Sequence, residues 1–235
     1  NNIDLKVEKI KKSFVNSKNY EIIFVDDKSD DGSLEKIIIL SKNNSNINYF
    51  IPKKRLGLGG ALSLGQKNSN GDFILFLDCD NSINISDLKK LINSRKDNTL
   101  VIGSRYLKES KINGVNNLKI FFSRSINFLV SNYLTIPAID ISHSCRIFPN
   151  SVILKTNNFK HPIFFWEHTL CCVYKGLKIL EIPITFDERK SGKSKNSFFS
   201  LFKNIFFAVI LILKLKFKYK WLNIQKITYL LGILK

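Results

Sequence analysis

The stretch DFILFLDCDNS, residues 72–82, joins a run of large apolar residues to a pair of acids. Residues 73–77 form an unbroken apolar run, which is typical of a strand buried on both faces of a sheet. The run leads directly into Asp78 and Asp80, with only Cys79 between them. Residues two apart on an extended backbone face the same side, so both carboxylates are expected at one point. Ligands bind outside the carboxyl ends of strands in open α/β sheets, and this stretch therefore predicts a ligand site.

Strand and helix patterns alternate around this stretch. Apolar spacing predicts helices over 2–14, 33–42, 58–68 and 85–94, and strands over 20–27, 47–51, 73–77 and 99–103. Such an alternation with short turns predicts an α/β fold with a doubly wound, mostly parallel sheet. Because a helix opens the chain where such sheets begin with a strand, we expect a first strand to precede Asn1.

The second half of the chain changes in character. An amphipathic helix is predicted over 118–134 and a further strand over 178–186, followed by a polar, basic loop over 187–197. The last helical pattern, 198–222, has an apolar centre over 205–213 that is too short to span a bilayer. Lysines and Trp221 follow it, as in helices that lie at the membrane–water interface. A buried C-terminal helix is the alternative.

The composition is strongly basic. The 235 residues contain 37 Lys and Arg against 19 Asp and Glu, which gives a formal charge of +18. Such a charge attracts anionic lipid, phosphorylated substrates or nucleic acid, although a genome rich in AT also enriches lysine. A nucleic-acid binder is one alternative, but no binding motif is present and the aromatic residues form core-like runs, so we expect no nucleic-acid partner. The four cysteines lack metal-site spacing and are expected to be free thiols of a reducing cytoplasm.

Paired acids at the end of a strand are suited to binding a divalent cation. Asp78 and Asp80 offer the hard oxygen ligands that Mg²⁺ or Mn²⁺ binds together with substrate phosphates. Acids that simply cap turns are the alternative. A second acidic strand end, Asp26–Asp27, is expected at the same edge and favours a pocket for a nucleoside diphosphate.

The glycine-rich stretch LGLGGAL (56–62) is not a dinucleotide-binding fingerprint, since Leu62 occupies the position of the third glycine.

Five motifs in order carry a family resemblance over residues 1 to about 200. IIFVDDKSDDGS, RLGLGGAL, DFILFLDCD, VIGSRY and FDERKSGKSK resemble those of the family 2 glycosyltransferases of the GT-A fold. Among these the chain is most similar to the polyprenyl-phosphate sugar transferases, such as the dolichol-phosphate mannose synthases. The resemblance implies a GT-A domain over 1–197 and a membrane-interface helix and tail over 198–235.

The resemblance also implies roles for individual residues. Asp78 and Asp80 would bind Mg²⁺ or Mn²⁺. Substrate-binding roles are implied for Asp26, Asp27, Gly57, Asp78, Arg146, Arg189, Gly192, Ser194 and Lys195, and catalytic roles for Asp80, Arg105, Arg124 and Glu167. The two catalytic arginines would lie near the phosphates, because a planar guanidinium meets two phosphate oxygens at once.

Two departures from the family pattern stand out. Ser82 replaces a glutamine that often follows the paired acids. DISHSCRIF (140–148) stands where these synthases read D-x-T-S-G-F-R, so that Ser144 replaces a glycine. We expect this second change to reshape the acceptor pocket.

The expected activity is metal-dependent, inverting transfer of a hexose. The donor would be a nucleotide-diphospho-sugar, and the acceptor a polyprenyl phosphate at the cytoplasmic face of the cell membrane, to which the protein would bind peripherally. One alternative is transfer to a sugar hydroxyl of a surface polysaccharide, with Glu167 as general base. The other is a degenerate, non-catalytic module that binds a membrane surface.

Overall fold

The structure, a computed structural model, describes residues 2–14, 19–79, 82–153 and 164–188. In chain order its elements are α1 (Asn2–Ser13), β1 (Ile22–Val25), α2 (Ser33–Asn43), β2 (Ile47–Phe50), α3 (Gly57–Lys67), β3 (Phe73–Phe76), α4 (Ile85–Asn93), β4 (Thr99–Ser104), β5 (Lys111–Asn113), α5 (Asn117–Tyr133), β6 (Arg146–Pro149), α6 (Phe164–Tyr174), β7 (Lys178–Pro183) and β8 (Thr185–Asp187). The predicted α/β alternation is confirmed through β4. The predicted strand 178–186 is divided into β7 and β8.

The first helix closes a small core over the first two strands. Ile3, Val7 and Ile10 recur at helical spacing on α1, and all three are buried. They pack against Phe24 of β1 and Ile47 of β2, in a cluster that Leu77 also joins. Because Leu77 directly precedes Asp78, this packing holds the end of β3 beside the end of β1.

Strand β4 is buried on both faces, with helices on either side. Leu100 points to the face that α6 covers with Phe164, and Val101 points to the opposite face, where Leu91 of α4 packs. Neither Leu100 nor Val101 is accessible to solvent. This alternation is the period of two expected of a strand, and it confirms the prediction of helices on both faces.

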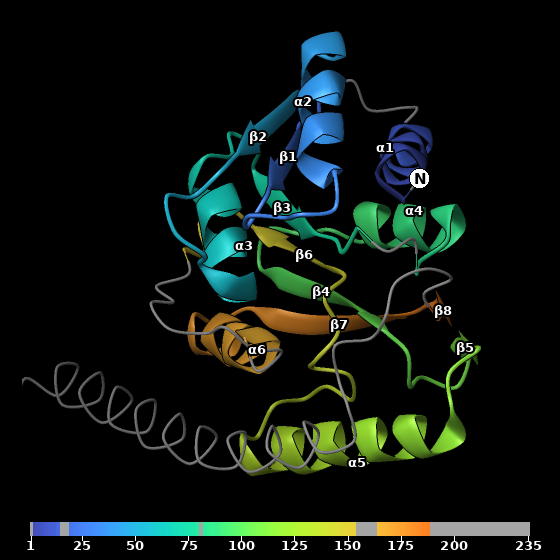
Figure 1. Cartoon of the computed structure of the whole chain (residues 1–235). Coiled ribbons are helices and arrows are strands. Elements are labelled where there is room, and N and C mark those ends of the chain that lie inside the picture. The colour runs from blue at the N-terminus through green and yellow to red at the C-terminus, as the bar shows by residue number, and fades with distance from the viewer. Residues whose placement is uncertain (1, 15–18, 80–81, 154–163, 189–235) are drawn as a thin grey trace, which may run out of the picture.

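The described strands form three sheets, β1–β2, β3–β6–β4–β7 and β5–β8, and among them the four-stranded sheet contains an antiparallel strand. The pairs β1–β2, β4–β7 and β5–β8 are parallel, whereas β6 lies between β3 and β4 and runs antiparallel to both. The chain leaves β4 at Ser104, passes through α5, and enters β6 at Arg146 (Figure 1). Ile102 of β4 pairs with Arg146, so the chain re-enters the sheet near the edge where β4 ends. A strand that starts there must run back through the sheet.

Helix α5 lies along one end of the molecule (Figure 1). Val130 and Leu134, at its C-terminal end, pack against Trp166 and Leu170 of α6. Its other face is exposed. Within the described part of the chain, no helix combines the length and the apolar character that a bilayer crossing requires.

Candidate functional site

Two carboxylates after β1 are bound to the protein backbone. Asp26 is buried and accepts a hydrogen bond from the Ser29 amide at 3.1 Å. The oxygens of Asp27 accept from the amides of Leu56 at 2.7 Å and Gly57 at 2.8 Å, at the start of α3. Gly57 has φ of 73°, a left-handed conformation that glycine adopts without strain. The predicted donor-binding residues Asp27 and Gly57 therefore contact each other and link β1 to α3.

Asp78 follows β3 and is half-buried. Its Oδ2 accepts a hydrogen bond from the hydroxyl of Ser144 at 2.6 Å. Asp80, the other predicted metal ligand, lies outside the described residues. A carboxylate at the end of a buried strand has the hard oxygen chemistry that Mg²⁺ and Mn²⁺ prefer, so Asp78 fits a role as one ligand. No group of three or more His, Cys, Asp and Glu side chains suited to a metal occurs among residues 2–14, 19–79, 82–153 and 164–188.

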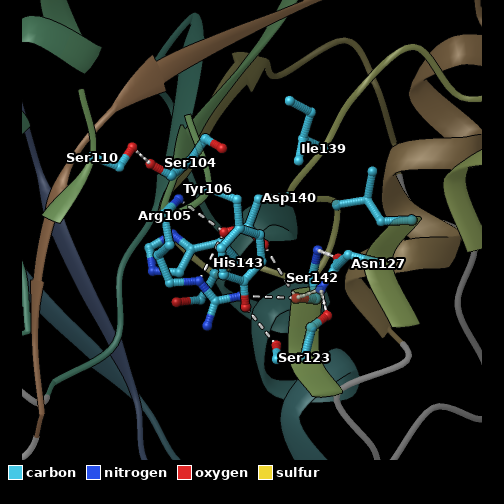
Figure 2. Close-up of polar contacts among 12 residues, drawn as sticks. Ser104, Arg105, Tyr106, Ser110, Ser123, Asn127, Ile139, Asp140, Ser142 and His143 are labelled. Atoms are coloured by element: carbon cyan, nitrogen blue, oxygen red, sulfur yellow. Dashed lines mark hydrogen bonds and ion pairs between the residues drawn. The ribbon is translucent and has the colours of Figure 1, made fainter. Parts of the chain in front are cut away.

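Arg105 directly follows β4 and forms a two-point ion pair with Asp140. Its Nε lies 2.7 Å from Asp140 Oδ2, and its Nη2 lies 2.8 Å from Oδ1 (Figure 2). The Asp140 side chain is fully buried, while that of Arg105 keeps 18% of its surface exposed. Burial opposes both charges, but Asp140 raises the pKa of the guanidinium and Arg105 lowers the pKa of the carboxyl group. Most of the Arg105 guanidinium is therefore engaged with the protein.

The ion pair belongs to a network that joins the loop of residues 140–146 to α5. Arg105 Nη2 donates to Ser142 Oγ at 3.0 Å, and Asn127 of α5 donates to the same oxygen at 3.0 Å. Asn127 Oδ1 in turn accepts from the Ser142 amide at 3.0 Å (Figure 2). From β7, the Glu181 carboxylate accepts from the amides of Ile139 and Asp140 at 2.8 and 2.9 Å. The loop is thus held from two sides.

Asn127, Ser142 and Glu181 were not among the site residues predicted from the sequence. Asn127 had a detectable signal, because it is a polar residue on the side of the helix where Val130 and Leu134 face the core. Glu181 also had one, as an acid between the apolar residues Leu180 and Ile182 of a strand. Ser142 had no signal of its own, because a serine in a loop is ordinary, whereas Ser144 had been noted only as a departure from the family pattern.

Arg146 lies in the interior of the protein, although a substrate-binding role was predicted for it. Its side chain is fully buried. Its Nη1 donates to the Phe165 carbonyl at 3.1 Å and to Thr169 Oγ1 at 2.9 Å, and its Nη2 donates to the Ile141 carbonyl at 3.1 Å. These bonds offset the cost of burying the charge, and burial lowers the pKa of the guanidinium to about 10. Arg146 joins the loop to α6 and offers no exposed atom to a ligand.

The other two predicted catalytic residues lie in contrasting environments. Arg124 is on α5 and is exposed. Glu167 is on α6 and retains 2% of its surface. It faces the interior of the described structure, and residues 154–163, which precede α6, lie outside that description. Arg189, Gly192, Ser194 and Lys195 also lie outside the described residues, as does the predicted interface helix.

The geometry therefore brings part of the predicted site together. Asp78 meets the 140–146 loop directly through Ser144, and Arg105 holds the same loop through Asp140. The result is a half-buried carboxylate beside a loop fixed by an ion pair, at the end of the central strands.

Comparison with known proteins is consistent with this arrangement. Residues 2–156 match the family model described as glycosyl transferase family 2. A dolichol-phosphate mannosyltransferase of Pyrococcus furiosus is 30% identical over 186 residues, covering 75% of this chain and 51% of the relative. One from Saccharomyces cerevisiae is 31% identical over 90 residues, covering 38% of this chain and 34% of the relative. The chain thus spans about half or less of the length of these relatives.

Solved structures share the fold at low sequence identity. Glucosyl-3-phosphoglycerate synthase from Mycobacterium tuberculosis, in complex with uridine diphosphate, superposes with a TM-score of 0.58 at 12% identity, covering 92% of this chain and 76% of that one. GalNAc-T7 with UDP, GalNAc and Mn²⁺ gives 0.50 at 11% identity, covering 79% and 41%. The fold is therefore that of the GT-A glycosyltransferases, and the matched family model shows that this chain belongs to glycosyl transferase family 2.

Proposed function

We propose that the chain transfers a hexose, with inversion and with Mg²⁺ or Mn²⁺, from a nucleotide-diphospho-sugar to a polyprenyl phosphate. The observation that carries this proposal is the position of Asp78, at the end of β3 and in contact with the 140–146 loop. Family membership supports sugar transfer. The relatives named as dolichol-phosphate mannosyltransferases support a lipid phosphate as the acceptor.

The donor would bind at the edge formed by the ends of β1 and β3. Asp26, Asp27 and Gly57 would contribute to the nucleoside pocket, and Asp78 with Asp80 would hold the cation. A bound divalent cation neutralises charge on the diphosphate leaving group. The fold neighbour solved with UDP and Mn²⁺ is compatible with this donor side. Arg189, Gly192, Ser194 and Lys195 would close over the diphosphate from the basic loop.

The acceptor would be a phosphate that is already ionised. One of its oxygens attacks the anomeric carbon as the bond to the nucleoside diphosphate breaks, which inverts that carbon. Because the nucleophile needs no base, Glu167 would orient neighbouring groups rather than take a proton. Arg124, which is exposed on α5, and the accessible part of Arg105 would supply positive charge near the phosphates. Positioning and charge stabilisation would supply most of the catalysis.

The outer face of α5 would contact the membrane that carries the acceptor. An exposed apolar stripe runs along this face, formed by Leu118, Phe121, Phe122, Phe128 and Leu129. Lys119 and Arg124 are exposed on the same helix. Exposed aromatic side chains next to cations are suited to a bilayer with anionic headgroups. The rings insert at the membrane interface, and the cations are attracted to the headgroups. Together with 198–235 as a second interface helix and tail, this would hold the protein peripherally at the cytoplasmic face of the cell membrane.

The test is transfer by the purified full-length chain. GDP-mannose and UDP-glucose, each with Mg²⁺ or Mn²⁺, are offered with polyprenyl phosphate in liposomes, and glycolipid formation is measured. We expect one donor to be used and the product to have the inverted anomeric configuration. Asp78→Asn should lower the rate at least about 100-fold, since loss of charge stabilisation at such sites costs about 2.7–4 kcal/mol. The matched variant Asp97→Asn, at an exposed carboxylate after α4, should keep the wild-type rate. Absence of transfer from every donor contradicts the proposal.

A further inference from the structure

Ser144 lies opposite Asp78 because of the register between β3 and β6. This antiparallel register pairs Phe73 with Pro149 and Phe76 with Arg146. Each step forward along β3 therefore moves one step back along the partner strand, and two steps beyond the last pair bring Asp78 opposite Ser144. Their side chains meet there, since Ser144 Oγ donates to Asp78 Oδ2 at 2.6 Å.

The backbone around Ser144 is fixed on both sides. The carbonyl of His143 accepts a hydrogen bond from Arg146 Nε at 3.1 Å. The carbonyl of Cys145 accepts one from the Gly103 amide of β4 at 2.9 Å. Ser144 itself keeps 8% of its surface exposed. The backbone that carries the Ser144 side chain is therefore held in place by bonds that do not involve Asp78.

A hydroxyl held in this way can determine how a carboxylate points. A hydrogen bond to an ionised group is roughly twice as strong as one between neutral groups. A carboxylate has about four acceptor positions, so a bond from one hydroxyl leaves capacity for a cation. The contact also depends on this chain's own sequence, because the family pattern D-x-T-S-G-F-R has glycine, which carries no hydroxyl, at this position.

We propose that Ser144 is a positioning residue for Asp78. Its hydroxyl holds the carboxylate in the orientation that binds the divalent cation, and it thereby links the 140–146 loop to the donor side of the site. This inference rests on the proposed function, which assigns the cation to Asp78.

The experiment measures cation binding rather than turnover. Mn²⁺ is titrated calorimetrically into the full-length protein with saturating UDP, and separately with GDP, for wild type, Ser144→Ala, Ser144→Gly and Ser144→Thr. We expect the alanine and glycine variants to bind Mn²⁺ about 10-fold more weakly, which is about 1.4 kcal/mol. The threonine variant keeps a hydroxyl and should bind within about threefold of wild type.

A second buried serine is the matched control. Ser131 on α5 keeps 5% of its surface, and its hydroxyl donates only to the nearby Phe128 carbonyl among the bonds described, at 3.1 Å. Ser131→Ala should leave the Mn²⁺ affinity unchanged, and thermal unfolding should show that every variant is folded.

The outcomes separate this inference from the function on which it rests. Wild-type protein that binds no Mn²⁺ with either nucleotide overturns both. Wild-type binding with unchanged affinity in Ser144→Ala and Ser144→Gly overturns the role of Ser144 alone. An equal loss in Ser131→Ala also overturns that role, because it would show a general effect of losing a buried hydroxyl.

Discussion

Removing the Asp140 carboxylate should destabilise the protein strongly. Asp140→Ala leaves the Arg105 guanidinium without its partner, at a site where the arginine side chain has 18% of its surface exposed. Breaking a buried ion pair from one side costs about 3–5 kcal/mol. Because Arg105 can regain some hydration through its exposed part, we take the lower end and expect a loss of about 3 kcal/mol. For a chain of this size, that corresponds to a fall of about 6–12 °C in the unfolding midpoint.

The assay is urea unfolding followed by circular dichroism, with the slope m compared between variants. An unchanged m with a lower midpoint assigns the loss to the native state. Glu8→Ala is the matched control, because Glu8 and Lys12 form an ion pair in which both side chains are more than half exposed. Surface pairs contribute little, so this variant should unfold at the wild-type urea concentration. A loss of less than about 1 kcal/mol for Asp140→Ala would refute the assignment of a stabilising buried pair.

The same pair predicts a dependence on acid. Burial opposes the charge of Asp140, but the charge and hydrogen bonds of Arg105 outweigh it and lower the pKa of this carboxyl group in the folded protein. The unfolded state therefore binds more protons as the pH falls below about 4. The stabilisation from this carboxylate is therefore complete above about pH 4 and is lost as the pH falls through the lower folded pKa. Asp140→Asn cannot titrate, so its free energy of unfolding should change less than that of wild type below about pH 4. Equal slopes for the two proteins would contradict this reasoning.

Three further predictions concern the acceptor, the membrane and a buried histidine. Glu167→Gln should retain most transfer to polyprenyl phosphate; loss of nearly all transfer would instead favour a hydroxyl acceptor with Glu167 as base. The double variant Phe121→Ser, Phe128→Ser should bind anionic vesicles at least about 10-fold more weakly in a sedimentation assay. The control Ile39→Ser, at an exposed apolar site on α2, should bind them like wild type. Equal binding by the wild type, the double variant and the control would contradict the proposed role of α5. Burial, followed by the charge of Arg146, lowers the pKa of His168 well below its usual value. Wild-type stability should therefore decrease as the pH falls below about 6.5, and His168→Gln should remove part of that slope in urea unfolding; an unchanged slope would contradict it.

Local patterns were sufficient for most of the secondary structure. The apolar run of 73–77 and the acids after it predicted a buried strand that ends in polar residues, and the structure has β3 at 73–76 with Asp78 just beyond. Helix α1 followed from Ile3, Val7 and Ile10, whose spacing places them on one face. The order of five short motifs was sufficient for the family. Each of these inferences depends on residues close together in the chain.

The antiparallel strand β6 shows what local patterns could not determine. The apolar run within this strand, residues 147–149, is too short to stand out in the sequence. Residues 146–149 form a strand because β3 and β4 offer hydrogen-bonding partners on both sides. Arg146 is buried because β6 lies between β3 and β4 in the sheet, where its side chain is covered by the core. Because Arg146 is charged and lies in a motif shared with the family, it was predicted to contact a ligand. In the structure its buried side chain instead forms hydrogen bonds to α6.

Local periodicity and the order of the motifs were enough to predict the α/β alternation, the family and the acids at the strand ends. The contacts of Ser144 with Asp78 and of Arg105 with Asp140 could be found only in the folded chain. Both contacts join residues 35 or more positions apart. The physical reason is that strand pairing and its register, which bring such residues together, depend on contacts made across the whole fold.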